Sequence, residues 1–125
     1  LGVCESWMTP ALFLSVAFIA GSVISFFTGS SWGTFAICIP IAVPMAYSFT
    51  GGQLGTLVYA AVGAVVSGGL FGDHCSPVSD TTVLSSLGAA CDHIDHVRTQ
   101  LPYALLAAAV SIILWIVVAL VGGAV

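Results

Sequence analysis

Four apolar stretches, separated by clusters of glycine, serine and threonine, run along the chain at residues 10–27, 32–49, 54–71 and 101–125. Each is close to the roughly 20 apolar residues that cross a bilayer as an α-helix. A bilayer accepts only helices or closed barrels, and the ten-residue alternation of barrel strands is missing here. The pattern predicts an all-α membrane protein whose transmembrane helices form a single membrane domain over residues 1–125.

The second stretch differs from the others because it contains two prolines. Pro40 and Pro44 each remove a helical hydrogen-bond donor, so we expect a kink or a break there. The segment 28–34, between the first two stretches, is small and rich in hydroxyls. Residues 10–49 therefore fit either two full spans with an ordinary loop or a re-entrant hairpin with its tip at 28–34.

The third stretch carries a stripe of small residues at four-residue spacing. Small side chains on one face of a membrane helix let another helix approach closely. We therefore predict a packing face that contains Thr56, Ala60, Ala64, Gly68 and Gly72.

The last stretch follows a short polar segment. Pro102 suits the first turn of a helix, so we expect the helix to begin near residue 101. Arg98 then lies in the preceding loop, which the positive-inside rule places in the cytoplasm. Trp115, in the middle of this stretch, is expected to fill the core or to face lipid.

Composition excludes two broad classes of protein. Charged residues make up 5% of the chain and hydrophobic residues 59%, whereas a soluble domain carries about 25% charged residues. With one Lys or Arg and a formal net charge of −4, the chain has no basic patch for a phosphate backbone. We expect neither a soluble globular domain nor a nucleic-acid-binding protein.

Oxygen-bearing side chains gather where the third stretch ends. Asp73 and Asp80 follow an uncharged segment, and Pro77 between them stops the helix from continuing. Unwound backbone at membrane depth lines a cavity or is buried in protein. Hard cations prefer carboxylate, carbonyl and hydroxyl oxygens. The segment therefore predicts a cation site, to which hydroxyls are available from Ser76, Ser79, Thr81 and Thr82.

The two carboxylates need a neutralising charge. Each costs about 2.5 to 3.5 kcal/mol inside a membrane on insertion scales, and no lysine or arginine precedes Asp80. The charge is therefore a proton, a metal cation, or a basic residue elsewhere in a longer chain. Exchange of a proton for a cation at one aspartate is the minimal mechanism of an antiporter. Alternatively, Asp73 and Asp80 lie at the water interface and only cap the helical segments that follow.

A second polar cluster ends at Arg98. Its spacing predicts an interfacial helix with local ion pairs, in which Arg98 lies close to Asp92, Asp95 and His96. A zinc site is disfavoured because the available ligands have no usual spacing; they are His74, Cys75, Cys91, His93 and His96.

Enzyme motifs are incomplete. The segment 29–33 matches G-x-S-x-G with Ser31 as the nucleophile, but the strand-turn-helix context is absent. The Gly-x-Gly-Asp signature of intramembrane aspartyl proteases would need glycine where the chain has Leu70. We therefore expect no enzymatic activity and no cofactor.

Three segments together resemble a known family. SFFTGSSWGT at 25–34, FGDHCSPVSDTT at 71–82 and CDHIDHVRTQLP at 91–102 strongly resemble the NhaC-type sodium/proton antiporter family. The resemblance covers residues 25–103 and places the three motifs in the family's order.

The resemblance implies a secondary active transporter that exchanges sodium ions for protons, as a multi-pass protein of the inner cell membrane. Such a transporter has two inverted repeats, each with a re-entrant hairpin and a broken helix. This chain would be a C-terminal part, with the lipid bilayer, sodium, protons and the missing N-terminal repeat as its partners. Asp80 would be the main proton and cation carrier and Asp73 the second. The ion- and proton-binding residues would be Asp80, Asp73, Ser76, Ser79, Thr81, Ser30, Ser31 and Thr34.

Two other functions stay open. A relative could exchange an organic solute, such as a carboxylate or an amino acid, coupled to sodium or protons. The lack of a basic residue near Asp80 favours an inorganic ion, because an anionic solute usually needs a cationic group or a helix N-terminus. A membrane packing or assembly subunit without transport is supported only by the small-residue stripe.

Overall fold

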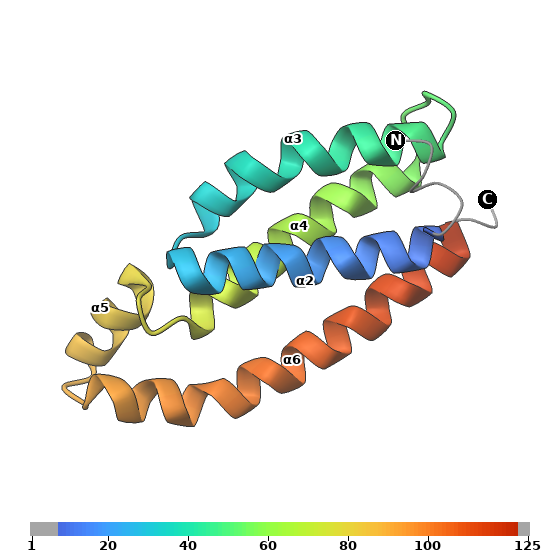
Figure 1. The fold of residues 1–125 in the computed structure, drawn as a ribbon. Coiled ribbons are helices and arrows are strands. Elements are labelled where there is room, and N and C mark those ends of the chain that lie inside the picture. The colour runs from blue at the N-terminus through green and yellow to red at the C-terminus, as the bar shows by residue number, and fades with distance from the viewer. Residues whose placement is uncertain (1–7, 123–125) are drawn as a thin grey trace.

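A computed structural model describes residues 8–122, which are helical with short connections and contain no strand. Four of the helices are long and apolar enough to cross a membrane, so the all-α prediction is confirmed. Figure 1 shows the helices α2 (Pro10–Thr28), α3 (Ser31–Phe49), α4 (Thr56–Cys75), α5 (Asp80–Gly88) and α6 (His93–Gly122). The end of the last predicted stretch, 123–125, lies outside the described residues.

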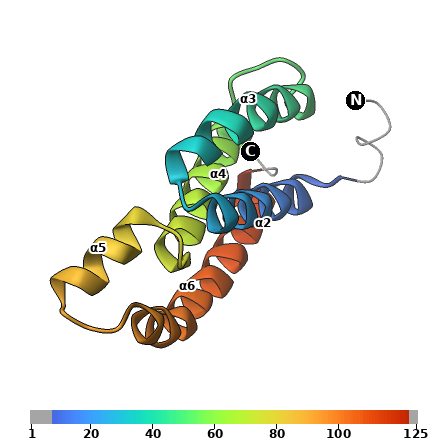
Figure 2. The ribbon, with the colours of Figure 1, turned by 60° about the vertical axis from the view of Figure 1, so that its left-hand side comes forward.

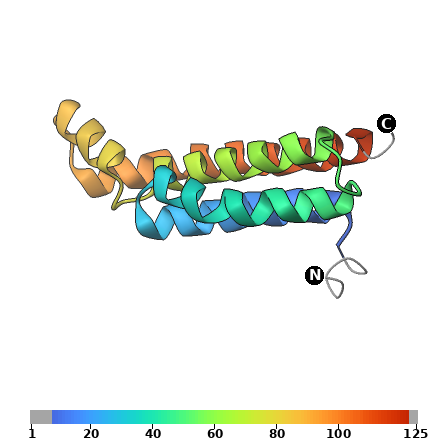
Figure 3. The same ribbon diagram turned by 90° about the horizontal axis from the view of Figure 1, so that it is seen from above.

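The four long helices run roughly side by side in two layers, α2 with α3 and α4 with α6 (Figure 3). Figures 1 and 2 show the short helix α5 at one end of this bundle, beside the turn between α2 and α3. The residues expected to form a site at 28–34 and at 73–80 therefore meet at one end of the bundle.

The core contains buried residues of all four long helices, and at its centre α2 and α4 approach backbone to backbone. A Cβ atom added to Gly68 would collide with the carbonyl oxygen of Phe18, and one added to Gly72 would collide with that of Ser22. Ala60 and Ala64 of the same stripe are also buried. The predicted packing face is confirmed for these residues, whereas Thr56 at its end is exposed.

The helix α3 continues through both of its prolines, so of the expected kink or break, the break is wrong. Each proline removes a single helical hydrogen bond, which leaves the other turns paired. In a bilayer the helix is the conformation that satisfies the remaining backbone groups, and isolated prolines are tolerated there.

The helix α6 begins earlier than expected. It starts at His93, so Pro102 lies inside the helix and Arg98 lies in its second turn rather than in a loop. Asp92 explains the start, because its Oδ1 accepts hydrogen bonds from the backbone N–H groups of Ile94 and Asp95 at 2.9 and 3.2 Å. Asp92 thus caps the helix, which runs without interruption into the apolar stretch.

Trp115 joins α6 to α4. Its indole N–H donates a hydrogen bond of 3.1 Å to the hydroxyl of Ser67, and a Cβ added to Gly63 would lie 2.7 Å from its ring. The expectation of a packing role for Trp115 is confirmed.

Candidate functional site

The helix interruption lies at the predicted place. The helix α4 ends at Cys75, and Ser76 and Ser79 adopt extended backbone with φ/ψ of −71/131° and −69/137° before α5 begins. Pro77 between them lacks the N–H that a continuing helix would need. We call residues 76–79 the break.

A buried carboxylate spans the break. Asp73, in the last turn of α4, is 9% exposed, and its Oδ1 accepts a 2.6 Å hydrogen bond from the hydroxyl of Ser79. The Ser79 hydroxyl also lies 2.8 Å from the hydroxyl of Thr81. Asp73, Ser79 and Thr81 thus form a hydrogen-bonded row from the interior of α4 to the first turn of α5.

The Ser79 side chain forms hydrogen bonds within this row rather than with the backbone of α5. It occupies the N-cap position of α5 but makes no side-chain cap hydrogen bond, although a serine there usually accepts one. The partial positive charge of the α5 N-terminus adds a favourable field for an anion at this place.

The geometry of the row is compatible with both protonation states of Asp73, with opposite directions of hydrogen-bond donation. With Asp73 ionised, Ser79 donates to the carboxylate and Thr81 donates to Ser79. With a proton on the Oδ1 of Asp73, that oxygen donates to Ser79, which then donates to Thr81. The same three oxygens therefore accommodate both protonation states.

Asp80 has a different environment. It is exposed in the first turn of α5, and its Oδ1 accepts a 2.8 Å hydrogen bond from the backbone N–H of Thr81. The capping alternative therefore describes Asp80 better than Asp73. Asp73, ranked second from the sequence, is the buried carboxylate of the row and bonds to its central member, Ser79.

The turn between α2 and α3 packs directly on the break. Ser76 is fully buried, and its hydroxyl donates a 2.6 Å hydrogen bond to the carbonyl oxygen of Phe26. Gly29 caps α2 in the left-handed conformation, with φ of 65°. A Cβ atom there would lie 2.8 Å from the carbonyl oxygen of Val78. The two motifs separated in sequence are thus in contact.

The site residues predicted at the start of α3 are Ser30, Ser31 and Thr34, and two of them bond within their own turn. The Ser30 hydroxyl accepts a hydrogen bond from the N–H of Gly33 at 3.4 Å, and Thr34 donates to the carbonyl oxygen of Ser30 at 3.0 Å. Ser31 is 6% exposed and Thr34 is fully buried. Within residues 8–122, these three hydroxyls form no hydrogen bond with Asp73.

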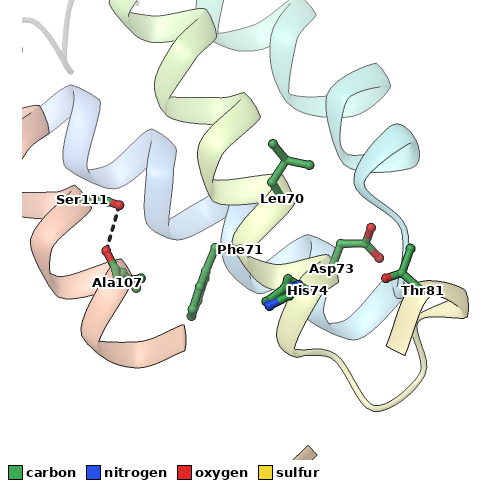
Figure 4. Close-up of a pocket in the computed structure, with 8 residues that line it drawn as sticks. Leu70, Phe71, Asp73, His74, Thr81, Ala107 and Ser111 are labelled. Carbon is green, nitrogen blue, oxygen red and sulfur yellow. Dashed lines mark hydrogen bonds between the residues drawn. The ribbon is translucent and has the colours of Figure 1, made fainter. Parts of the chain in front are cut away.

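A cavity of about 410 Å³ opens beside Asp73, between the end of α4 and the middle of α6. Figure 4 shows Asp73 and Thr81 directed toward each other, with Phe71, Ala107 and Ser111 on the far side of His74. A second cavity of about 310 Å³ shares His74 and Thr81 and continues to His96 and Gln100. Thr81, at the end of the row, reaches both cavities.

Two residues of α6 hold the break in place: Gln100, which the sequence did not single out, and His93, which it considered only as a zinc ligand. Gln100 donates a 2.7 Å hydrogen bond to the carbonyl oxygen of His74, which also accepts one from Thr82 at 3.2 Å. His93 lies 2.7 Å from the carbonyl oxygen of Pro77. The spacing of 93, 96 and 100 puts these side chains on one helix face, and this signal was available in the sequence.

The described residues offer no preformed transition-metal centre. Between residues 8 and 122, no three His, Cys, Asp or Glu side chains gather closely enough to hold a metal ion. The ligands considered for zinc are instead distributed over several roles, such as the contact of His93 with Pro77.

Several proteins similar to this chain are named as antiporters. Residues 3–120 match the family described as the Na+/H+ antiporter family. The chain is 37% identical over 114 residues to the malate-2H(+)/Na(+)-lactate antiporter of Bacillus subtilis (strain 168), covering 91% of this chain and 23% of that protein. It is 34% identical over 114 residues to the arginine/ornithine antiporter ArcD of Halobacterium salinarum, covering 91% and 22%.

A third relative is the Na(+)/H(+) antiporter NhaC of Alkalihalophilus pseudofirmus, 32% identical over 113 residues, which cover 90% of this chain and 23% of the relative. The chain thus spans less than a quarter of the length of these relatives. No solved structure matches it. The family match and the four apolar helices together indicate a multi-pass membrane protein. The chain belongs to the Na+/H+ antiporter family.

Proposed function

We propose that this chain carries one half of the ion site of a secondary transporter that exchanges sodium for protons across the cell membrane. The observation that carries the proposal is the buried carboxylate of Asp73 at a helix break, hydrogen-bonded to Ser79. The family supports transport by antiport.

The oxygens at the break suit a hard cation. An ionised carboxylate has about four acceptor positions, and one on Asp73 is taken by Ser79 within residues 8–122. Asp73 also lines the larger cavity, together with Thr81. Carboxylate and hydroxyl oxygens are the ligands that sodium and similar cations prefer. A sodium ion therefore has a carboxylate and two hydroxyls available at one place.

Charge balance leads to exchange rather than to simple binding. Arg98 is the single Lys or Arg of the chain, and no hydrogen bond joins it to Asp73 in the part that the structure describes. We propose that a proton and a cation neutralise the negative charge at Asp73 in turn, rather than a basic residue elsewhere in a longer chain. Because the row is compatible with either direction of hydrogen-bond donation, either occupant leaves every hydroxyl paired.

The rest of the site comes from outside this chain. We propose that a further, inverted repeat of a longer protein packs against it, with residues 10–49 as a re-entrant hairpin and α4–α5 as a broken helix. The length of the relatives supports this proposal, because the chain spans 23% of the NhaC antiporter.

Sodium-driven proton movement tests the proposal. The full-length transporter that contains this chain is reconstituted in liposomes with an internal pH dye, as wild type and as Asp73→Asn, Asp80→Asn and Asp95→Asn. Asp95 is exposed on α6, outside the break, and serves as the matched control. We expect exchange in the wild type and in Asp95→Asn, and loss of at least tenfold in Asp73→Asn.

The other outcomes have defined meanings. If sodium-driven proton movement is lost in Asp80→Asn alone, Asp80 is the carrier, in agreement with the ranking from the sequence. If exchange is unchanged in both Asp73→Asn and Asp80→Asn, the ion site does not lie at the break. If the wild type does not move protons with sodium, the proposed ion exchange is wrong.

An organic solute is the second candidate function. The cavity of about 410 Å³ beside Asp73 has apolar walls from Leu70, Phe71 and Ala107, which a small organic molecule could contact. Two relatives are named for organic solutes, malate and lactate in one and arginine and ornithine in the other. Counterflow of labelled malate, lactate or arginine in the same liposomes tests this function: uptake that persists without a sodium gradient would favour it over sodium/proton exchange.

A further inference from the structure

The imidazole of His93 connects the two sides of the break. Its Nε2 lies 2.7 Å from the carbonyl oxygen of Pro77, in the unwound segment. Its Nδ1 lies 3.1 Å from the hydroxyl of Ser86, near the end of α5. The Ser86 hydroxyl also lies 2.9 Å from the carbonyl oxygen of Val83. His93 itself belongs to the first turn of α6, so three segments meet at one ring.

The number of protons on the His93 ring determines how many of these three contacts can be hydrogen bonds at the same time. A carbonyl oxygen only accepts, so the Nε2 of His93 must carry a proton to bind Pro77. A doubly protonated ring also donates from Nδ1 to Ser86, whose own proton is then free for Val83, and all three contacts are satisfied. A neutral ring has one proton fewer, so one contact is lost. With the proton on Nδ1 the contact with Pro77 is lost, and with the proton on Nε2 the Ser86 hydroxyl donates either to His93 or to Val83 but not to both.

We propose that His93 is a proton-linked positioning residue for the site at Asp73. Pro77 lies between Ser76, which is fixed to α2, and Ser79, which donates to Asp73. The contact of His93 with the Pro77 carbonyl oxygen therefore determines the position of the Ser79 hydroxyl relative to Asp73. This inference rests on the proposed function, since it concerns the same site.

Other ionisable groups surround this arrangement without bonding to the ring. The hydrogen-bond partners of the ring within residues 8–122 are Pro77 and Ser86. Titratable or charged groups on the elements packed at this end are Asp73, His74 and Cys75 on α4, Asp80 on α5, Cys91 and Asp92 in the turn, and Asp95, His96 and Arg98 on α6. Histidine is the side chain that ordinarily exchanges its proton near physiological pH.

Two substitutions of His93 by amide side chains distinguish the roles of its two ring nitrogens. In His93→Gln the side-chain N–H₂ extends to the position of Nε2 and still donates to Pro77, but it does not titrate. In His93→Asn the shorter amide replaces Nδ1 and cannot reach Pro77. The pair therefore differs in the contact that the proposal requires, while both variants stay polar and neutral.

The experiment uses the full-length transporter and two readouts. Amide hydrogen exchange of residues 76–83, corrected for intrinsic rates, is measured across pH 5 to 8 together with the KM for sodium and the maximal exchange rate. We expect His93→Asn to lower the protection of 76–83 and to raise the KM by about three- to tenfold, the equivalent of one hydrogen bond, with little change in maximal rate. His93→Gln should restore both values.

The pH profile provides the remaining test. In the wild type the protection of 76–83 should fall as pH rises and the ring loses its proton, whereas in His93→Gln it should be flat. Equal behaviour of the Gln and Asn variants, or a Gln profile that superimposes on the wild type, overturns the proposal. If the wild type exchanges no sodium, the proposed function fails by itself, and protection across the pH series still decides the role of His93.

Discussion

Gly29 and Val78 touch where the turn between α2 and α3 meets the break: a Cβ atom at position 29 would lie 2.8 Å from the carbonyl oxygen of Val78. The backbone of Gly29 is also left-handed, with φ of 65°. Two independent reasons therefore demand glycine at this position, one conformational and one steric. The contact holds two distant motifs in a fixed relation.

Gly29→Ala should lower the free energy of unfolding by about 2 to 4 kcal/mol, since the φ strain and the collision add. Gly51→Ala is the matched control, because Gly51 has φ of 68° and no atom within 4 Å of a Cβ. It should cost about 1 to 2 kcal/mol, from the strain alone. Unfolding in detergent measures both, and equal losses would show that the contact with Val78 is unimportant.

Gly68→Ala should disrupt the core, because its Cβ would collide with the carbonyl oxygen of Phe18. Overpacking of this kind costs about 1 to 3 kcal/mol. In Gly33→Ala the nearest atom to the Cβ would be the hydroxyl oxygen of Ser30 at 3.9 Å. This control should instead stabilise α3 slightly, by up to about 1 kcal/mol. A tolerated alanine at position 68 would contradict the close approach of α2 and α4.

Ser79→Ala should weaken sodium binding, because it removes the hydroxyl that donates to Asp73. Hydrogen bonds to charged groups contribute about 1.5 to 3 kcal/mol, which corresponds to an increase in KM of at least about tenfold. Ser48→Ala is the comparison, since the Ser48 hydroxyl is exposed and bonds to carbonyl oxygens of its own helix. Equal KM values for the two variants would remove Ser79 from the site.

Trp115→Phe should destabilise the attachment of α6 to α4 through loss of the hydrogen bond to Ser67. Ser67→Ala removes the same bond from the other side, so the double variant should be non-additive by about 0.5 to 1.5 kcal/mol. A double-mutant cycle from unfolding in detergent measures this coupling. Strict additivity would mean that the indole contributes only its packing against Gly63.

The helices could be predicted from the sequence because bilayer length and apolar runs constrain them strongly. The errors arose at prolines, where a local rule competes with the surroundings. Pro44 loses one donor, but the rest of α3 has no better way to pair its backbone. Pro102 suggested a helix start, whereas the capping carboxylate of Asp92 starts the helix earlier, within residues too polar to join the apolar pattern.

The site was partly predictable for a different reason. Serine, threonine and aspartate around Pro77 marked the break by local spacing alone. The resemblance ranked Asp80 ahead of Asp73, and the sequence did not reveal the burial of Asp73, because that burial depends on how α5 folds back toward α4. The roles of His93 and Gln100 were missed since their partners Pro77 and His74 lie 16 and 26 residues away.

The glycine contacts between α2 and α4 also determine how this part of the molecule moves. Where backbone meets backbone at Gly68 and Gly72, no side chain between the two helices can change rotamer, which opposes sliding by small adjustments there. The two helices act as a single stiff arm. In the transporter proposed above, the carboxylate at the end of α4 would therefore keep its surroundings, and the loaded site would move as a unit.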